Sequence, residues 1–272
     1  MKSIGILKKS CCVVTLALFS VVWAQSNQST VPPQKLETDY RTNNCVACHA
    51  QISQPVALSN RYFEWHSSAH KEVGVSCEKC HGGDATTSDK AKAHVGIYPY
   101  ADSRSKIHFR NLPATCQSCH QGIVNAFVES KHYQNLKTTG LGPSCSNCHA
   151  HMASEVVLSP PQISLLCAYC HDTINGALPP RPDIREKAEA VMQSLNRADV
   201  AVGWAASLLR EAEMKRLSIA PERMQVLAAQ RMLKDAKFSW HSFALDATQK
   251  KADDAFSLAM RAKDDLGKKV NH

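Results

Sequence analysis

Long hydrophobic runs, a large excess of one charge and unassigned cysteines are all scarce in this sequence of 272 residues. After residue 24 no apolar stretch reaches the roughly 20 residues that cross a bilayer, so no membrane span is expected there. The formal net charge is +8, and it falls to +5 when the three lysines of residues 1–24 are removed. So small an excess argues against a nucleic-acid surface and is typical of solvated charge, with a basic docking face for an acidic partner as the alternative.

The first 24 residues have the composition of a secretory signal peptide. Three lysines precede an apolar stretch from Cys11 to Ala24, and a polar run begins at Gln25. This order predicts export with cleavage before Gln25. The alternative is an uncleaved anchor, for which the apolar stretch is short.

Ten of the twelve cysteines lie in copies of the motif Cys-x-x-Cys-His. The copies are Cys45/Cys48/His49, Cys77/Cys80/His81, Cys116/Cys119/His120, Cys145/Cys148/His149 and Cys167/Cys170/His171. In this motif the two thiols bond to porphyrin vinyl groups, and the His binds the iron as its proximal ligand. We therefore predict five covalently bound haem c groups. Zinc ribbons and short disulfides are the alternatives, but neither explains a His directly after every second Cys.

The motifs also predict the domain organisation. Residues 25–44 are polar and contain Pro32-Pro33, which indicates a flexible leader. Residues 45–181 hold every motif but few large apolar side chains, so we expect a pentahaem domain of short helices and loops wrapped around porphyrin. The overall fold class is then mainly α with extensive loops.

Two segments of this domain repeat one another. The pattern aromatic-x-x-Ser-x-His occurs at residues 65–70 and 127–132, and each copy precedes a Ser-Cys pair that opens a haem motif. The repeat suggests two duplicated two-haem modules with the fifth motif added. The alternative is convergence on a common ligand pattern.

Residues 182–272 differ in character and are expected to form a C-terminal hairpin of long helices. Apolar residues recur at intervals of three and four from Ile184 to Ala212, and again from Val226 to Phe243. Asp183 is placed to cap the first helix, and Pro221 suits the start of the second.

The end of this region leaves two choices open. The second helical stretch either runs unbroken to Gly267 or divides near Asp246. Its many alanines permit close helix approach, either within the chain or in a homodimer.

The histidines outside the motifs decide between an electron carrier and a catalyst. An iron with two protein ligands transfers electrons, whereas an iron with an open position can bind a small molecule. The candidates for the second, distal ligand are His70, His94, His108, His132 and His241, with His151 and His66 in reserve. Because candidates outnumber irons, we expect five bis-His, low-spin haems, as in a carrier.

The first motif, residues 65–70 and the second motif with Gly82 are similar to a known family. They resemble the multihaem cytochromes that include the tetrahaem electron acceptor of hydroxylamine oxidoreductase, and this resemblance implies that His70 is a distal ligand. Ser239-Trp240-His241 and the surrounding helices resemble the helical end of pentahaem nitrite reductases and octahaem hydroxylamine oxidoreductases. That second resemblance implies that His241 binds iron.

These observations predict a periplasmic pentahaem cytochrome c that relays electrons between redox partner proteins, with no nucleic-acid partner. One alternative is a small reductase of nitrite, hydroxylamine or a sulfur oxyanion with one five-coordinate haem. All five motifs end in His and no Cys-x-x-Cys-Lys variant is present, so no catalytic residue is assigned. A second alternative is a haem-carrying docking subunit that joins a larger respiratory or extracellular assembly through its C-terminal helices.

Overall fold

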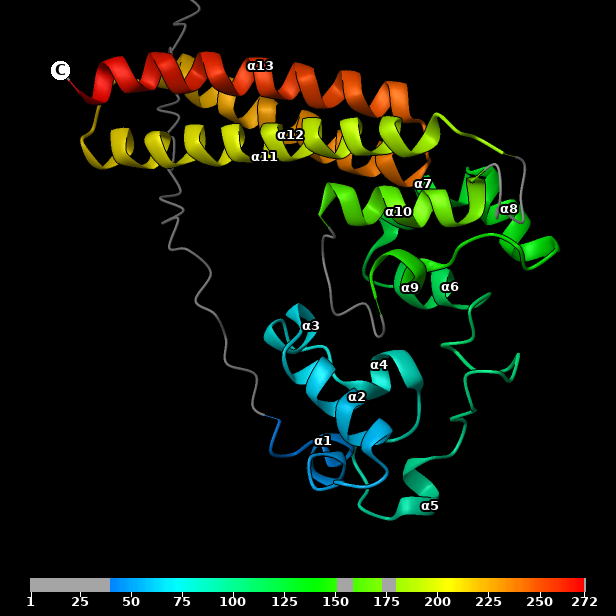
Figure 1. Ribbon diagram of the computed structural model, residues 1–272. Helices are drawn as coiled ribbons and strands as arrows, with labels where there is room; N and C mark the ends of the chain where they lie inside the picture. The colour runs from blue at the N-terminus through cyan, green and yellow to red at the C-terminus, as the bar shows by residue number, and fades with distance from the viewer. Residues whose placement is uncertain (1–39, 151–158, 173–179, 272) are drawn as a thin grey trace, which may run out of the picture. The chain divides into compact units, whose positions relative to one another are not determined.

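The computed structural model describes residues 40–150, 159–172 and 180–271, and every regular element in these ranges is a helix (Figure 1). The prediction of a mainly α fold is confirmed. The predicted signal peptide and residues 25–39 of the predicted leader lie outside the described ranges. Among the described helices, none combines the length and the apolar character that crossing a membrane requires.

Residues 40–150 and 159–172 fold into short helices joined by loops. Those described are α1 (Asn44–His49), α2 (Val56–His66), α3 (Ala69–Glu72), α4 (Cys77–His81), α5 (Lys90–Ala93), α6 (Leu112–Gln117), α7 (Gln121–Val128), α8 (Lys131–Thr138), α9 (Cys145–Cys148) and α10 (Pro160–His171). Few of its described apolar side chains are buried, namely Val46, Trp65, Pro113, Val124, Phe127, Leu136 and Ile163. So small a set of buried side chains agrees with the expectation that porphyrin supplies the core here.

Polar side chains at the helix starts explain how such short helices form. The side chains of Asn43, Ser68, Asp89 and Ser130 each accept a hydrogen bond from a backbone N–H in the first turn of α1, α3, α5 and α8. Such caps satisfy amides that have no partner within the helix. Tyr40, in the predicted leader, already packs edge-on against Trp65 at 5.0 Å between ring centres.

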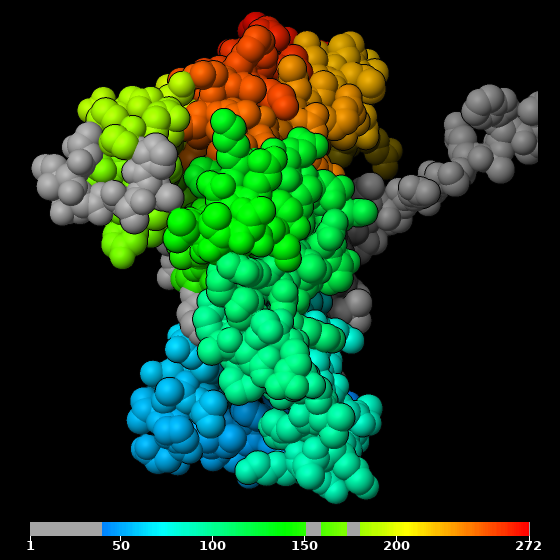
Figure 2. Space-filling view, turned by 90° about the vertical axis from the view of Figure 1, so that its right-hand side faces the viewer, coloured from blue at the N-terminus to red at the C-terminus, as the bar shows by residue number. Residues whose placement is uncertain are grey.

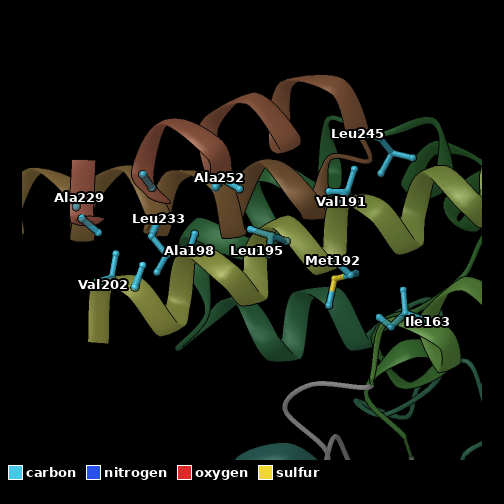
Figure 3. Packing of buried hydrophobic residues seen from close by; sticks show 14 residues of the cluster. Ile163, Val191, Met192, Leu195, Ala198, Val202, Ala229, Leu233, Leu245 and Ala252 are labelled. Carbon is cyan, nitrogen blue, oxygen red and sulfur yellow. The ribbon is translucent and has the colours of Figure 1, made fainter. Parts of the chain in front are cut away.

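The C-terminal region consists of three long helices, α11 (Ile184–Met214), α12 (Ala220–His241) and α13 (Leu245–Val270), which lie side by side (Figure 1). The predicted apolar stripe of α11 is buried from Ala188 to Ala212. Figure 3 shows this core, which includes Val191 and Leu195 of α11 and Leu233 of α12. Ile163 of α10 joins the same core, so the helix that carries the fifth motif is packed onto the helical region.

The structure also decides the choice that the sequence left open for the second helical stretch. The stretch divides near Asp246, since α12 ends at His241 and α13 begins at Leu245, and Phe243 between them adopts a left-handed backbone conformation with φ 60°. Because of this division the region is a three-helix unit instead of a hairpin.

Two further details differ from the sequence-based expectations. Asp183 precedes α11, but its carboxylate pairs with Arg181 at 3.0 Å and makes no capping bond. The last helix runs through Gly267 to Val270.

Packing explains why Gly267 does not end α13. Leu266 and Val270 on either side of it are buried, and Lys215 Nζ donates a hydrogen bond of 2.9 Å to the Val270 carbonyl. Burial of two apolar side chains outweighs the cost of about 1 kcal/mol that a glycine imposes on a helix.

Alanines allow the three helices to approach closely. In α13, the alanines at positions 252, 255, 259 and 262 have no exposed surface, and each faces the neighbouring helices. Their burial within the chain accounts for this pattern without a second copy, and no finding supports the homodimer.

We expect Ala259→Leu to destabilise the helical region, because Ala259 is fully buried and a larger side chain overpacks the core. The free energy of unfolding of the purified protein should fall by about 1–3 kcal/mol in denaturant titrations. Ser257→Leu, on the exposed side of the same helix, is the matched control and should change it by less than about 0.5 kcal/mol. Equal losses in both variants would contradict the packing.

Candidate haem-binding site

Each Cys-x-x-Cys-His motif occupies about one turn of a helix or the end of one. The motifs lie in α1, in α4, across the end of α6, in α9 and at the end of α10, and Cys119 and His120 of the third motif follow the last residue of α6. Cysteines three residues apart share one face of a helix, so the two thiols are presented together wherever both cysteines are helical. All ten motif cysteines are free thiols, available for bonds to vinyl groups.

The two thiols of a motif do not have equal surroundings, although the sequence-based prediction treats them alike. Cys48 and Cys170 are the second cysteines of the first and fifth motifs, and each is the residue before the last of its helix, α1 or α10. Cys48 is exposed and Cys170 is half-buried. Burial raises the pKa of Cys45 and Cys167, the first thiols of the same two motifs. The second thiol of the first motif therefore lies nearer to solvent than the first. The bonds of all ten motif cysteines to haem stay predictions.

Four motif histidines face the ring of a histidine from another part of the chain. The ring-centre distances are 6.2 Å for His49–His94, 6.1 Å for His70–His120, 5.9 Å for His132–His171 and 6.2 Å for His149–His241. Every pair joins one proximal histidine to one predicted distal candidate.

This spacing fits two imidazoles that bind one iron from opposite sides. An imidazole nitrogen binds a first-row metal at about 2.0 Å, so two nitrogens on opposite sides lie about 4 Å apart. Each ring centre lies roughly 1 Å beyond its nitrogen, which places the ring centres about 6 Å apart.

Burial favours the neutral imidazole that metal binding requires. Desolvation lowers the pKa of His49, His70, His132 and His241, and in each case the facing histidine lowers the pKa further. The backbone bond to Lys237 opposes this effect at His241, but the net shift of its pKa is still downward. A neutral ring keeps one nitrogen free to bind a metal.

Two of the distal candidates are held in the tautomer that offers Nε2. His94 Nδ1 lies 2.7 Å from the Lys90 carbonyl, and His241 Nδ1 lies 2.7 Å from the Lys237 carbonyl. A carbonyl oxygen only accepts hydrogen bonds, so Nδ1 carries the proton and the lone pair is on Nε2. These carbonyls were not predicted from the sequence, although each lies four residues before its histidine on a helix.

The repeated pattern of residues 65–70 and 127–132 has the same structure in both copies. Ser68 Oγ donates to the Trp65 carbonyl at 2.7 Å, and Ser130 Oγ donates to the Phe127 carbonyl at 2.7 Å. Both serines also cap the short helix that carries the histidine, so the hydroxyl joins two helices at a corner. His70 and His132 meet their partner rings at similar interplanar angles, 69° and 73°.

The C-terminal helices reach these histidines through side chains that were not predicted from the sequence. The Phe243 ring lies 4.0 Å from that of His132, and it is aimed there by the left-handed backbone that ends α12. Gly122 in α7 faces the Phe238 ring of α12 so closely that a Cβ would lie 2.8 Å from it. In the sequence, the only signal for this contact is a glycine two residues after the third motif, where a missing side chain lets another element pack closely.

The other predicted site residues have different surroundings. His108 lies 4.4 Å from the Phe109 ring, and its Nδ1 accepts a bond of 3.4 Å from the Arg110 N–H. His66 lies beside Tyr62 at 5.7 Å between ring centres. His81 lies half-buried in α4, and His151 is outside the described residues.

Neighbouring motifs lie together in the order of the chain. Helix α1 packs on α4, and α9 packs on α10, which brings together motifs one with two and four with five. Burial, together with the nearby Cys167 and Cys170, raises the pKa of Cys148 to about 11, as expected when motifs four and five adjoin. The nearby Cys145 thiol raises the pKa of Cys116, as expected when motifs three and four adjoin.

The second and third motifs are also neighbours. Burial raises the pKa of the Cys80 thiol, and the nearby Cys116 and Cys119 raise it further. The side chains of Lys79 and Ser118, one from within each motif, line a common pocket. The described residues therefore place the five motifs as a continuous series.

A helical chain that presents paired thiols beside facing imidazoles has the donor set of a protein with covalently bound haem c. Residues 20–82 match the family model described as cytochrome c554 and c-prime. The C-type polyheme cytochrome OmcB of Geobacter sulfurreducens is 30% identical over 115 residues, which cover 39% of this chain and 13% of OmcB. OmcC of the same organism is 29% identical over 114 residues, covering 39% of this chain and 14% of OmcC.

These matches support the multihaem c-type cytochrome family for this chain. Cytochromes of this kind bind haem c covalently. The aligned segment spans only about an eighth of the length of the curated relatives that it matches. No solved structure matches the chain.

We expect Ser130→Ala to destabilise the corner that holds His132, because the hydroxyl donates to one helix and caps the next. The cost should be about 1–2 kcal/mol, measured as a fall in the free energy of unfolding. Ser130→Thr keeps the hydroxyl and should recover most of the loss. Ser103→Ala removes an exposed hydroxyl and is the control, and an equal loss there would contradict this role.

Proposed function

We propose that this chain is an exported pentahaem c-type cytochrome that relays electrons between redox partner proteins. The observation that carries the proposal is the set of four histidine pairs whose ring centres lie about 6 Å apart. The family match supplies the cofactor class, and the number of motifs supplies the count of five.

The thiols and proximal histidines of the five motifs would hold the haems within residues 45–181. We assign His94, His120, His171 and His241 as the partners of His49, His70, His132 and His149, respectively. When bound, haem supplies a one-electron couple, and its iron cycles between ferric and ferrous states. The chain's own histidines would set that couple by filling both axial positions.

This pattern of ligands favours transfer over catalysis. An iron with two imidazoles has no position left for nitrite, hydroxylamine or a sulfur oxyanion. The order of the motifs supports a path through five closely spaced groups, from the first motif to the fifth.

For the second motif, three histidines named from the sequence compete as the partner of His81. They are His108, His66 and His151. If none of these histidines binds, the haem of the second motif would have an open position and would be the site of the alternative reductase function. The spin state of that haem in histidine variants therefore assigns the partner of His81 and also tests the reductase alternative.

The histidine partnership also gives the helical region a role. His241 would connect residues 182–272 to the haem of the fourth motif. Phe243, which contacts His132, and Phe238, which packs against Gly122, add contacts between the same two regions. As a second candidate function, the exposed faces of these helices would dock the chain into a larger assembly. The exposed Trp204 and Val200 of α11 favour it, since both are large apolar side chains on one helix face.

We expect His94→Ala, His132→Ala and His241→Ala each to open one axial position. Each variant should gain the ferric high-spin signal of one haem in electron paramagnetic resonance, and added imidazole should restore the low-spin signal. The same spectra of His108→Ala and His66→Ala identify the partner of His81. A His241→Ala protein that stays fully low-spin would contradict the assignment.

The relay itself is tested on the purified wild-type protein. We expect five haem c per chain, an all-low-spin ferric spectrum, and no spectral change on adding nitrite or cyanide, or carbon monoxide after reduction. A high-spin signal that shifts with nitrite would support the reductase instead. Fractionation of cells that express the full chain, with N-terminal sequencing from Gln25, tests export and cleavage.

A further inference from the structure

A basic pocket lies between the second and third motifs. It is open, encloses about 400 Å³, and is lined by Lys79, Arg104, Lys106, Asn111, Ala114, Thr115 and Ser118. Three of these side chains are cations and none is acidic. The segment that joins α5 to α6, which supplies two of the cations, lies at the surface in Figure 2.

The loop that carries the cations is held by bonds to its own backbone. Asn111 Nδ2 donates to the Ser103 and Ser105 carbonyls, both at 2.8 Å, and Thr115 Oγ1 donates to the Lys106 carbonyl at 2.7 Å. These polar groups are used for the fold, which leaves the cations as the donors that face a ligand. A loop held in this way presents its charges with little loss of conformational entropy on binding.

Each cation is placed differently. Arg104 binds Asp102 through Nε and Nη2, and it stacks over the Tyr98 ring at 4.2 Å, so its Nη1 remains for another partner. The Lys106 stem passes beside Gly82, where a Cβ would lie 3.6 Å from it. Lys79 makes a long contact of 3.7 Å with Glu78, and two-thirds of its side chain is exposed.

The haems of these two motifs do not explain the charges. Lys79 and Ser118 each lie between the two cysteines of a motif, so the pocket adjoins thiols that bond to vinyl groups. Vinyl groups and propionates occupy opposite edges of a porphyrin, and the propionates of these haems are not the natural partners of the pocket.

We propose that this pocket is the docking point for carboxylates of an acidic redox protein. The inference rests on the proposed relay function and adds where on the chain a partner binds and by what chemistry. Carboxylates on a protein surface can engage three separate cations at once, whereas an open pocket desolvates a single small anion poorly. Docking here places the partner beside the second and third motifs, in the middle of the series.

Binding of a hexaglutamate peptide to the haem-loaded protein tests the docking chemistry. Calorimetry at an ionic strength of about 10 mM, where screening is weak, should detect binding that is lost at high salt. Lys79→Gln combined with Lys106→Gln should weaken it roughly threefold to tenfold. Lys251→Gln combined with Arg261→Gln removes the same charge from the exposed face of α13 and should leave it unchanged.

A second measurement uses small oxidants of opposite charge. Ferricyanide takes one electron from the reduced protein and becomes ferrocyanide, and tris(phenanthroline)cobalt(III) takes one electron as a cation. In stopped flow at low salt, the pocket variant should be re-oxidised several-fold more slowly by ferricyanide, with no slowing by the cobalt complex. Equal slowing with both oxidants would reflect a change in driving force and would overturn the proposal.

The remaining outcomes are also decisive. Equal weakening of peptide binding in the α13 variant, or citrate that binds as tightly as the peptide, would overturn docking of an acidic protein at this pocket. If the protein exchanges electrons with both oxidants but the pocket variant behaves as wild type, only the pocket proposal fails. If the haem-loaded wild type exchanges electrons with neither oxidant, the relay function fails.

Discussion

The distance between facing imidazoles is the constraint on which the rest of this structure depends. Four proximal histidines meet a second ring at 5.9–6.2 Å, and the second rings come from α3, the end of α5, α8 and α12. A spacing of this size leaves room for a metal between two nitrogens, and it ties segments that are distant in the sequence. Pairing of the histidines across a metal would fix the positions of short helices that bury few apolar side chains of their own.

The two repeated segments meet this constraint in the same way. His70 precedes the second motif but faces the third, and His132 precedes the fourth motif but faces the fifth. The serine corner that aims each ring is the same in both copies, which favours duplication over convergence on a ligand pattern. In each copy the histidine therefore faces the motif that follows the next one along the chain.

The helical region is built on a different principle. Its three helices pack through alanines and a conventional apolar core, and it contacts the motif region through His241, Phe243 and the Gly122–Phe238 approach. A core that forms from the chain's own side chains can hold His241 in place beside His149.

Local sequence determined the motifs, the alternation of helical stripes and the pattern that caps α3 and α8, because each depends on residues only a few positions apart. The Cys-x-x-Cys-His spacing predicted covalently bound haem c, and the apolar residues that recur from Ile184 predicted the buried face of α11. Only the tertiary structure decided that His94 faces His49, that α12 ends at a left-handed Phe243, and that α13 continues through Gly267. Those outcomes depend on contacts between segments far apart in the chain, where packing outweighs local preference.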